Sequence, residues 1–119
     1  MLLGLRTLIY NVDDLDAAKA WYTRVLGFGP YFDEPFYVGF SVGGFELGLD
    51  PDLTAVTPGT SQTGYWGVEN IEKEFERIKG TGAEVISQVT EVGGIRFATF
   101  RDPSRNTFAI IENPNFGQE

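Results

Sequence analysis

The chain has 119 residues, a formal net charge of −8, and neither histidine nor cysteine. This composition excludes disulfides and thiolate chemistry, and it argues against nucleic acid as a partner, because an excess of acidic side chains repels phosphates. The length fits one compact domain over 1–119; without a signal peptide or an apolar run near the roughly 20 residues that span a bilayer, we expect a cytoplasmic protein with no membrane partner.

The first half of the chain predicts a strand, a helix and three further strands. Residues 7–12 are apolar and β-rich. Residues 15–25 carry apolar side chains at helical spacing, after the acidic pair Asp13-Asp14 and before Gly27, which is typical of a helix end. Three strand-like runs follow, the last two joined by a Gly-Gly pair as in a tight hairpin: 29–33, 36–42 and 45–50.

The second half repeats this order. Residues 63–68 predict a strand, and residues 71–79 predict a helix whose end is marked by Gly80 and Gly82. Three more strand candidates follow: 83–92, 94–101 and 107–112. The second half therefore has the same βαβββ order as the first.

The two halves align at nearly constant offsets. The offset is 56 residues through the helix, as from Thr7 to Thr63, and 63 residues at the last strand, as from Phe45 to Phe108. Loops between helix and last strand absorb the difference. An internal repeat of this kind predicts an α+β fold of two tandem βαβββ modules, 1–51 and 63–114, joined by a linker over 52–62.

Three segments carry a recognisable pattern within these modules: 12–15 (VDDL), 20–28 (AWYTRVLGF), and 100–103 (FRDP) with Asn106. With these segments, the two modules resemble the vicinal oxygen chelate superfamily, which includes glyoxalase I, bleomycin resistance proteins and extradiol dioxygenases. Trp21 stands where the family usually has Phe, and Arg105 stands where it usually has Gly. The resemblance implies a cupped, mostly antiparallel sheet with helices outside and a ligand inside the cup. It also implies a homodimer, with or without exchange of modules between chains.

In the metalloenzymes of that family, the first and last strands of both modules supply four metal ligands. By the motif match, these positions fall on Thr7, Glu46, Thr63 and Ala109. One carboxylate, two hydroxyls and a methyl group do not make a site for Zn²⁺ or Fe²⁺, which need several imidazole, thiolate or carboxylate ligands. We therefore expect no metal and no cofactor.

Strand alternation predicts which side chains face the cup. The candidate ligand-binding set is Thr7, Ile9, Glu46, Gly48, Thr63, Tyr65, Ala109 and Ile111. Glu46 is the ionisable member, and it could be a general base, a counter-ion to a cationic ligand, or an exposed strand-end carboxylate. In the middle strands either Phe40 or Tyr37 lines the cup, because they lie on opposite faces.

Rings and one acid in a cup favour a planar or cationic organic ligand. The sequence thus predicts a metal-independent small-molecule binding protein, similar to bleomycin resistance proteins. One alternative is a glyoxalase-like lyase or isomerase, or an enzyme related to the ring-cleaving dioxygenases, with Glu46 as the possible catalytic residue. Another alternative is an accessory domain with a vestigial cup.

Overall fold

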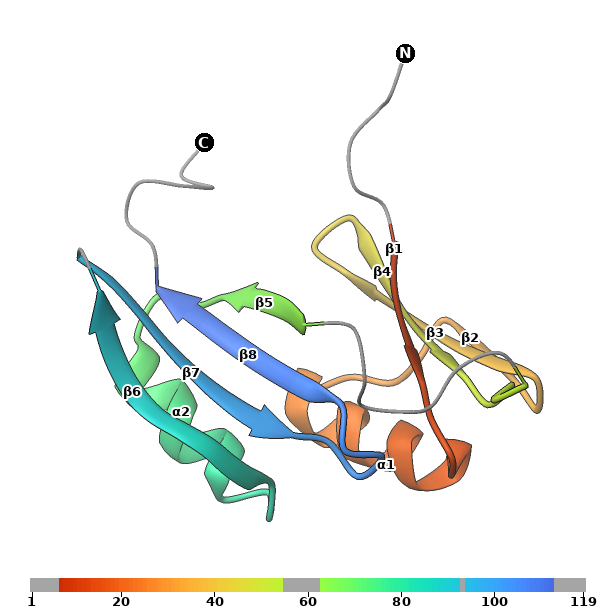
Figure 1. Ribbon diagram of the computed structural model, residues 1–119. Helices are drawn as coiled ribbons and strands as arrows, with labels where there is room; N and C mark the ends of the chain where they lie inside the picture. The colour runs from red at the N-terminus through yellow and green to blue at the C-terminus, as the bar shows by residue number, and fades with distance from the viewer. Residues whose placement is uncertain (1–6, 55–62, 93, 113–119) are drawn as a thin grey trace.

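The computed structural model describes residues 7–54, 63–92 and 94–112, and it contains the two predicted modules (Figure 1). Module one comprises β1 (Thr7–Asn11), α1 (Leu15–Leu26), β2 (Phe32–Glu34), β3 (Tyr37–Val42) and β4 (Phe45–Asp50). Module two comprises β5 (Thr63–Gly67), α2 (Ile71–Lys79), β6 (Glu84–Val92), β7 (Ile95–Arg101) and β8 (Thr107–Glu112). The α+β class and the repeated element order are confirmed. Most of the predicted linker lies outside the described residues.

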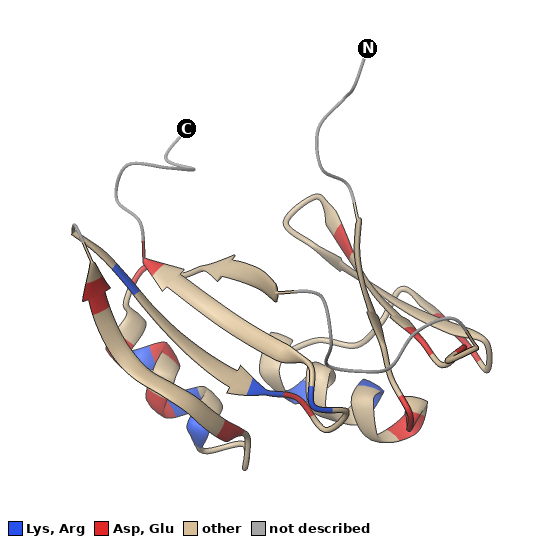
Figure 2. Cartoon of the chain, in the orientation of Figure 1, with Lys and Arg blue, Asp and Glu red and all other residues tan. Residues whose placement is uncertain are grey.

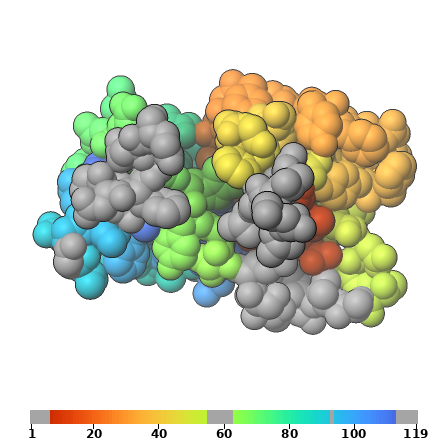
Figure 3. Space-filling view, turned by 90° about the horizontal axis from the view of Figure 1, so that it is seen from above, coloured from red at the N-terminus to blue at the C-terminus, as the bar shows by residue number. Residues whose placement is uncertain are grey.

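Each module forms its own four-stranded sheet. The strand orders are β1-β4-β3-β2 and β5-β8-β7-β6, so the two sheets have the same topology. In each sheet the first and last strands pair in parallel, and the other neighbours pair antiparallel. The mostly antiparallel character is confirmed, although the hydrogen bonding makes two sheets rather than one. Seen from above, module one (red to yellow) and module two (green to blue) lie side by side (Figure 3).

The helices lie on one side of the sheets, and we call the opposite face of each sheet the cup face (Figure 1).

Both helices begin at a side-chain cap. The Asp14 carboxylate accepts from the Ala17 N–H at 3.0 Å, and the Asn70 side chain accepts from the Lys73 N–H at 3.1 Å. Helix α1 ends at Gly27 with a φ of 87°, a left-handed conformation that glycine adopts without strain. In the described ranges, no helix is long and apolar enough to cross a membrane.

Helix α1 contacts the sheets of both modules. Its Tyr22 ring lies 6.5 Å from Phe40 of β3, measured between ring centroids. Its Trp21 ring lies 5.6 Å from Phe108 of β8 in an edge-to-face arrangement. All four rings are buried, so this helix of module one forms part of the core of module two as well.

A buried polar cluster also joins the modules. Asp102, which follows β7, is 4% exposed, and its carboxylate accepts from the Tyr22 hydroxyl at 3.0 Å. The same carboxylate accepts from the backbone N–H groups of Ser104 and Asn106 at 2.8 Å each. Arg105 in this turn has a φ of 69°, the left-handed region that favours the glycine expected there by resemblance. The motif over 102–106 is therefore a structural turn that ties module two to α1.

Candidate functional site

Strand alternation determines which side chains reach the cup face. In β4, Leu47 and Leu49 are buried toward α1, while Glu46 between strands β1 and β3 points to the cup face. In β3, Phe40 is fully buried in the core, so Tyr37 belongs to the cup face. This resolves the choice that the sequence left open for the middle strand of module one.

Three hydroxyl groups donate hydrogen bonds to the Glu46 carboxylate. Oε1 accepts from the Thr7 hydroxyl at 3.1 Å and from the Tyr37 hydroxyl at 3.0 Å. Oε2 accepts from the Tyr31 hydroxyl at 2.5 Å. We call these four side chains the Glu46 clamp. Thr7 is the register partner of Glu46 across the parallel β1–β4 pair, whereas Tyr31 comes from the segment before β2.

The hydrogen bonds of the clamp set the protonation states of its members. The bond from Tyr31 is the largest influence on Glu46, and together with those from Tyr37 and Thr7 it lowers the pKa of the carboxyl below its ordinary value, against the opposing effect of burial. Burial, followed by the bond to Glu46, raises the pKa of Tyr37 to about 12. The bond to Glu46 also raises the pKa of Tyr31. At neutral pH the clamp therefore holds one ionised carboxylate and two neutral phenols.

Two glycines on adjacent strands make room for the clamp. A Cβ atom on Gly48 would lie 1.9 Å from the Tyr37 hydroxyl oxygen, so the phenol occupies the space above this glycine. A Cβ atom on Gly39, the register partner of Gly48, would lie 2.8 Å from Glu46 Oε2 and 3.1 Å from the Tyr31 ring. The sequence left Tyr37 as one of two choices for the cup face and gave no indication of Tyr31. Paired glycines on the cup face are the signal that could have indicated a bulky neighbour.

Aromatic rings continue from the clamp toward β2. We call Tyr31, Phe32, Phe36 and Tyr37 the aromatic wall. The Phe32 ring lies 6.1 Å from Tyr37, 6.0 Å from Phe36 and 6.4 Å from Tyr31. Tyr31 and Phe36 are 63% and 66% exposed, so ring surface beside the carboxylate is open to a ligand.

The candidates in module two lie on the second sheet, and the register there differs from the prediction. Thr63 is opposite Thr107, and Tyr65 is opposite Ala109. Since Thr7 is opposite Glu46, the offset at the last strand is 61 residues rather than 63, and the predicted alignment of that strand was wrong by two residues. The prediction aligned Phe45 with Phe108 by residue type, whereas the pairing of strands depends on the lengths of the turns between them. The turn between β7 and β8 is longer than the hairpin between β3 and β4, so the offset is not the same along the two modules.

This register changes which positions correspond between the modules. Ala109 corresponds to Gly48, and Glu46 corresponds to Thr107. The structure brings Thr7, Glu46 and Gly48 together in module one, with Ile9 opposite Gly48. In module two Tyr65 is 56% exposed and Ile111 is partly buried, but Ala109 is fully buried.

These positions do not fit the metal that the resemblance implies. With the observed register, one carboxylate and three hydroxyls occupy the four corresponding positions: Thr7, Glu46, Thr63 and Thr107. The space above Gly48, which corresponds to Ala109, is filled by the Tyr37 phenol. Across 7–54, 63–92 and 94–112, no three acidic, histidine or cysteine side chains come together as a metal site requires. The donor set around Glu46 is one carboxylate and three hydroxyls that already donate to it.

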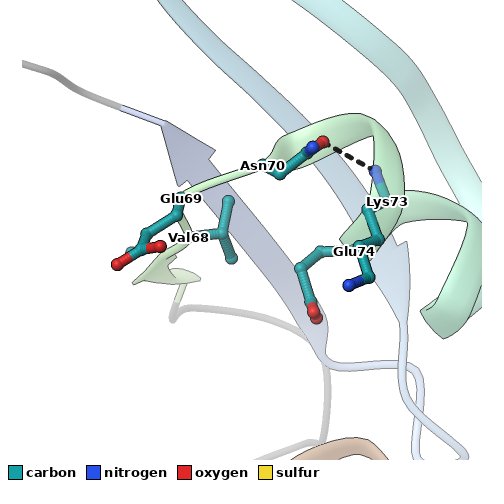
Figure 4. Close-up of a pocket in the computed structure, with 6 residues that line it drawn as sticks. Val68, Glu69, Asn70, Lys73 and Glu74 are labelled. Atoms are coloured by element: carbon teal, nitrogen blue, oxygen red, sulfur yellow. Dashed lines mark hydrogen bonds between the residues drawn. The ribbon is translucent and has the colours of Figure 1, made fainter.

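A surface hollow of about 390 Å³ lies at the start of α2, away from the clamp (Figure 4). It is lined by the turn from β5 into the helix: Gly67, Val68, Glu69, Asn70, Lys73 and Glu74. The dashed bond in Figure 4 is the helix cap, in which Asn70 accepts from the Lys73 N–H. Of its lining side chains, Asn70 caps the helix and Glu74 pairs with Arg77, and none belongs to the predicted cup-face set.

Comparisons with known proteins agree with this architecture. The family model of the Glyoxalase/Bleomycin resistance protein/Dioxygenase superfamily matches residues 4–110. The chain is similar in structure to a lactoylglutathione lyase from Agrobacterium tumefaciens, with a TM-score of 0.80 and 20% identity over 100% of both chains. It is also similar to a glyoxalase-related enzyme from Fulvimarina pelagi, with a TM-score of 0.80 and 18% identity over 95% of this chain and 90% of that one.

A glyoxalase/bleomycin resistance protein from Catenulispora acidiphila is 24% identical, with a TM-score of 0.74 over 93% of this chain and 100% of that one. At these identities the likeness shows the fold alone. No curated protein matches the sequence.

Proposed function

The chain belongs to the Glyoxalase/Bleomycin resistance protein/Dioxygenase superfamily, and we propose that it binds a small organic cation at the Glu46 clamp without a metal ion. The observation that carries the proposal is the set of three hydroxyls that donate to one carboxylate. They hold Glu46 in place beside the aromatic wall. A fixed carboxylate next to exposed rings is suited to a cation through ion pairing and cation–π contacts.

The protonation states favour binding over catalysis. A general base works best when its pKa lies near the working pH. The clamp lowers the pKa of Glu46, so the carboxylate is a weak base, and a pKa of about 12 keeps Tyr37 from acting as a phenolate. These groups are better suited to holding a charge than to moving a proton.

The charge distribution of module one supports a cationic ligand. Its strands carry no Lys or Arg, as Figure 2 shows, and by strand alternation three of their acidic residues lie on the cup face: Glu34, Glu46 and Asp50. The fourth, Asp33, lies on the helix face and pairs with Lys19 of α1 at 3.0 Å. The strands of module two carry Arg96 and Arg101 as well as acids. A region of one sign attracts ligands of the opposite sign over long distances, so the cup face of the first sheet is the favourable side for a cation.

Binding of cationic aromatic compounds to the wild type and to Glu46→Gln tests the proposal. Loss of a charge-assisted hydrogen bond should weaken binding by roughly tenfold or more, measured by calorimetry or NMR titration. Glu76→Gln on α2 is the matched control, because it makes the same charge change at an exposed position in the other module. Equal weakening in both variants would attribute the effect to net charge and overturn the proposal. If none of these compounds binds, the result would favour a vestigial site.

The absence of a metal requirement has its own test. Elemental analysis of protein grown in rich medium should find no stoichiometric transition metal, and a chelator should leave ligand affinity unchanged. A tightly held metal at one equivalent per chain would contradict the proposal.

A further inference from the structure

The Glu46 carboxylate has one unused acceptor position in the described part of the chain. An ionised carboxylate offers about four lone-pair positions, two on each oxygen. Oε1 accepts two bonds, from Thr7 and Tyr37, and is therefore saturated. Oε2 accepts one bond, from Tyr31, and retains one free position.

The carboxylate also lacks a cationic partner of its own. The described ion pairs of the protein lie elsewhere, and among the described residues no Lys or Arg pairs with Glu46. Hydroxyl donors orient the negative charge but leave it uncompensated. A ligand that donates one hydrogen bond and brings one positive charge would complete the site.

We propose that the clamp selects an ammonium with a single N–H, that is, a protonated tertiary amine, over a guanidinium or amidinium. The proposal rests on the function proposed above and specifies its ligand class. A guanidinium binds a carboxylate best through two parallel bonds, one to each oxygen, and Oε1 has no position left for the second. A quaternary ammonium has no N–H to donate, so it gains the charge attraction without the hydrogen bond.

The surroundings of Oε2 fit the carbon groups of such an amine. Tyr31 and Oε2 meet above Gly39, where a Cβ atom would lie within 3.1 Å of the ring and 2.8 Å of the oxygen. The exposed Tyr31 ring and the Phe32 ring, 6.4 Å from it, flank this position. Alkyl groups on a charged nitrogen are attracted to ring faces. The open acceptor therefore lies where an N–H and its alkyl neighbours can both be received.

Three probes with the same benzyl group separate these cations: N,N-dimethylbenzylammonium, benzyltrimethylammonium and benzylguanidinium. NMR titration of the wild-type protein at neutral pH should give about tenfold tighter binding of the dimethyl compound than of either other probe. The Thr7→Ala variant removes the hydroxyl donor and leaves room for another donor at the freed position on Oε1. In this variant the dissociation constants of dimethylbenzylammonium and benzylguanidinium should differ by about threefold or less. Thr63→Ala, the corresponding change in module two, should leave the order of affinities for the three probes as in the wild type.

The outcomes distinguish the two proposals. Benzylguanidinium binding as tightly as the dimethyl compound, with both lost in Glu46→Gln, would overturn the selectivity and leave the proposed function standing. An unchanged ratio of the two dissociation constants in Thr7→Ala would overturn the explanation by the number of free acceptor positions. Binding of none of the probes, or binding that is indifferent to Glu46→Gln, would overturn the proposed function and the selectivity together.

Discussion

Replacement of Gly48 by alanine should displace the Tyr37 side chain. The added Cβ would lie 1.9 Å from the hydroxyl oxygen of Tyr37 and 2.6 Å from its Cζ, too close for both groups to stay. Gly48 is not among the positive-φ residues, so alanine suits its backbone. The phenol is the group that moves, and its 3.0 Å bond to Glu46 is lost.

The cost follows from these two effects. Overpacking of an ordered region costs about 1–3 kcal/mol, and a lost hydrogen bond to a charged acceptor costs about 1.5–3 kcal/mol. The effects overlap, because moving the ring relieves the clash by breaking the bond. We expect Gly48→Ala to lower the free energy of unfolding by about 2 kcal/mol, which is roughly an 8 °C decrease in melting temperature for a domain of this size.

A double-mutant cycle isolates this contact. Urea unfolding would be measured for the wild type, Gly48→Ala, Tyr37→Ala and the double variant. With the ring absent, Gly48→Ala should change the free energy of unfolding by less than about 0.5 kcal/mol or stabilise slightly, because alanine restricts the unfolded chain. An equal cost of Gly48→Ala in both backgrounds would refute the reasoning, since the clash would then not involve Tyr37.

Two further predictions concern the buried cluster and the clamp. Tyr22→Phe removes a 3.0 Å bond to the buried Asp102 carboxylate and should cost about 1–3 kcal/mol in urea unfolding. Tyr65→Phe, at a 56% exposed position, is the control and should lower the free energy of unfolding by less than about 0.5 kcal/mol. Equal losses in Tyr22→Phe and Tyr65→Phe would contradict a stabilising role of the bond to Asp102. The clamp lowers the pKa of Glu46 below its ordinary 4.5, so protonation of Glu46 favours the unfolded state. The stabilisation that the ionised Glu46 provides is complete above pH 4.5 and is lost as the pH falls through the lower pKa of the folded state. The stability advantage of wild type over Glu46→Gln should therefore shrink as the pH falls below 4.5, and a constant difference would be inconsistent with an ionised clamp.

Local signals predicted the fold well. Helix α2 and the strands β4 and β8 have the predicted bounds, because a cap or turn marks each end in the sequence. The predicted strand over 29–33 is instead Phe32–Glu34. Tyr31 precedes that strand, although its N–H still donates to the Gly39 carbonyl at 2.9 Å.

The site was predictable only in part. Alternation along β1 and β4 placed Thr7 and Glu46 on one face, and the parallel register then brings them into contact. Tyr31 reaches Glu46 from 15 residues away through a segment without periodicity. The register at β8 depends on the length of a turn rather than on matching letters, so Ala109 was paired with the wrong position of module one.

The sharing of α1 between the two sheets makes each module depend on the other for a complete core. A module with this helix but without a neighbour would leave the Trp21 ring without Phe108, which lies 5.6 Å away in the other module. Either module, produced alone, would therefore expose part of the core that the two modules share. Because both modules are in one chain, their association is unimolecular, and the shared core forms at any protein concentration.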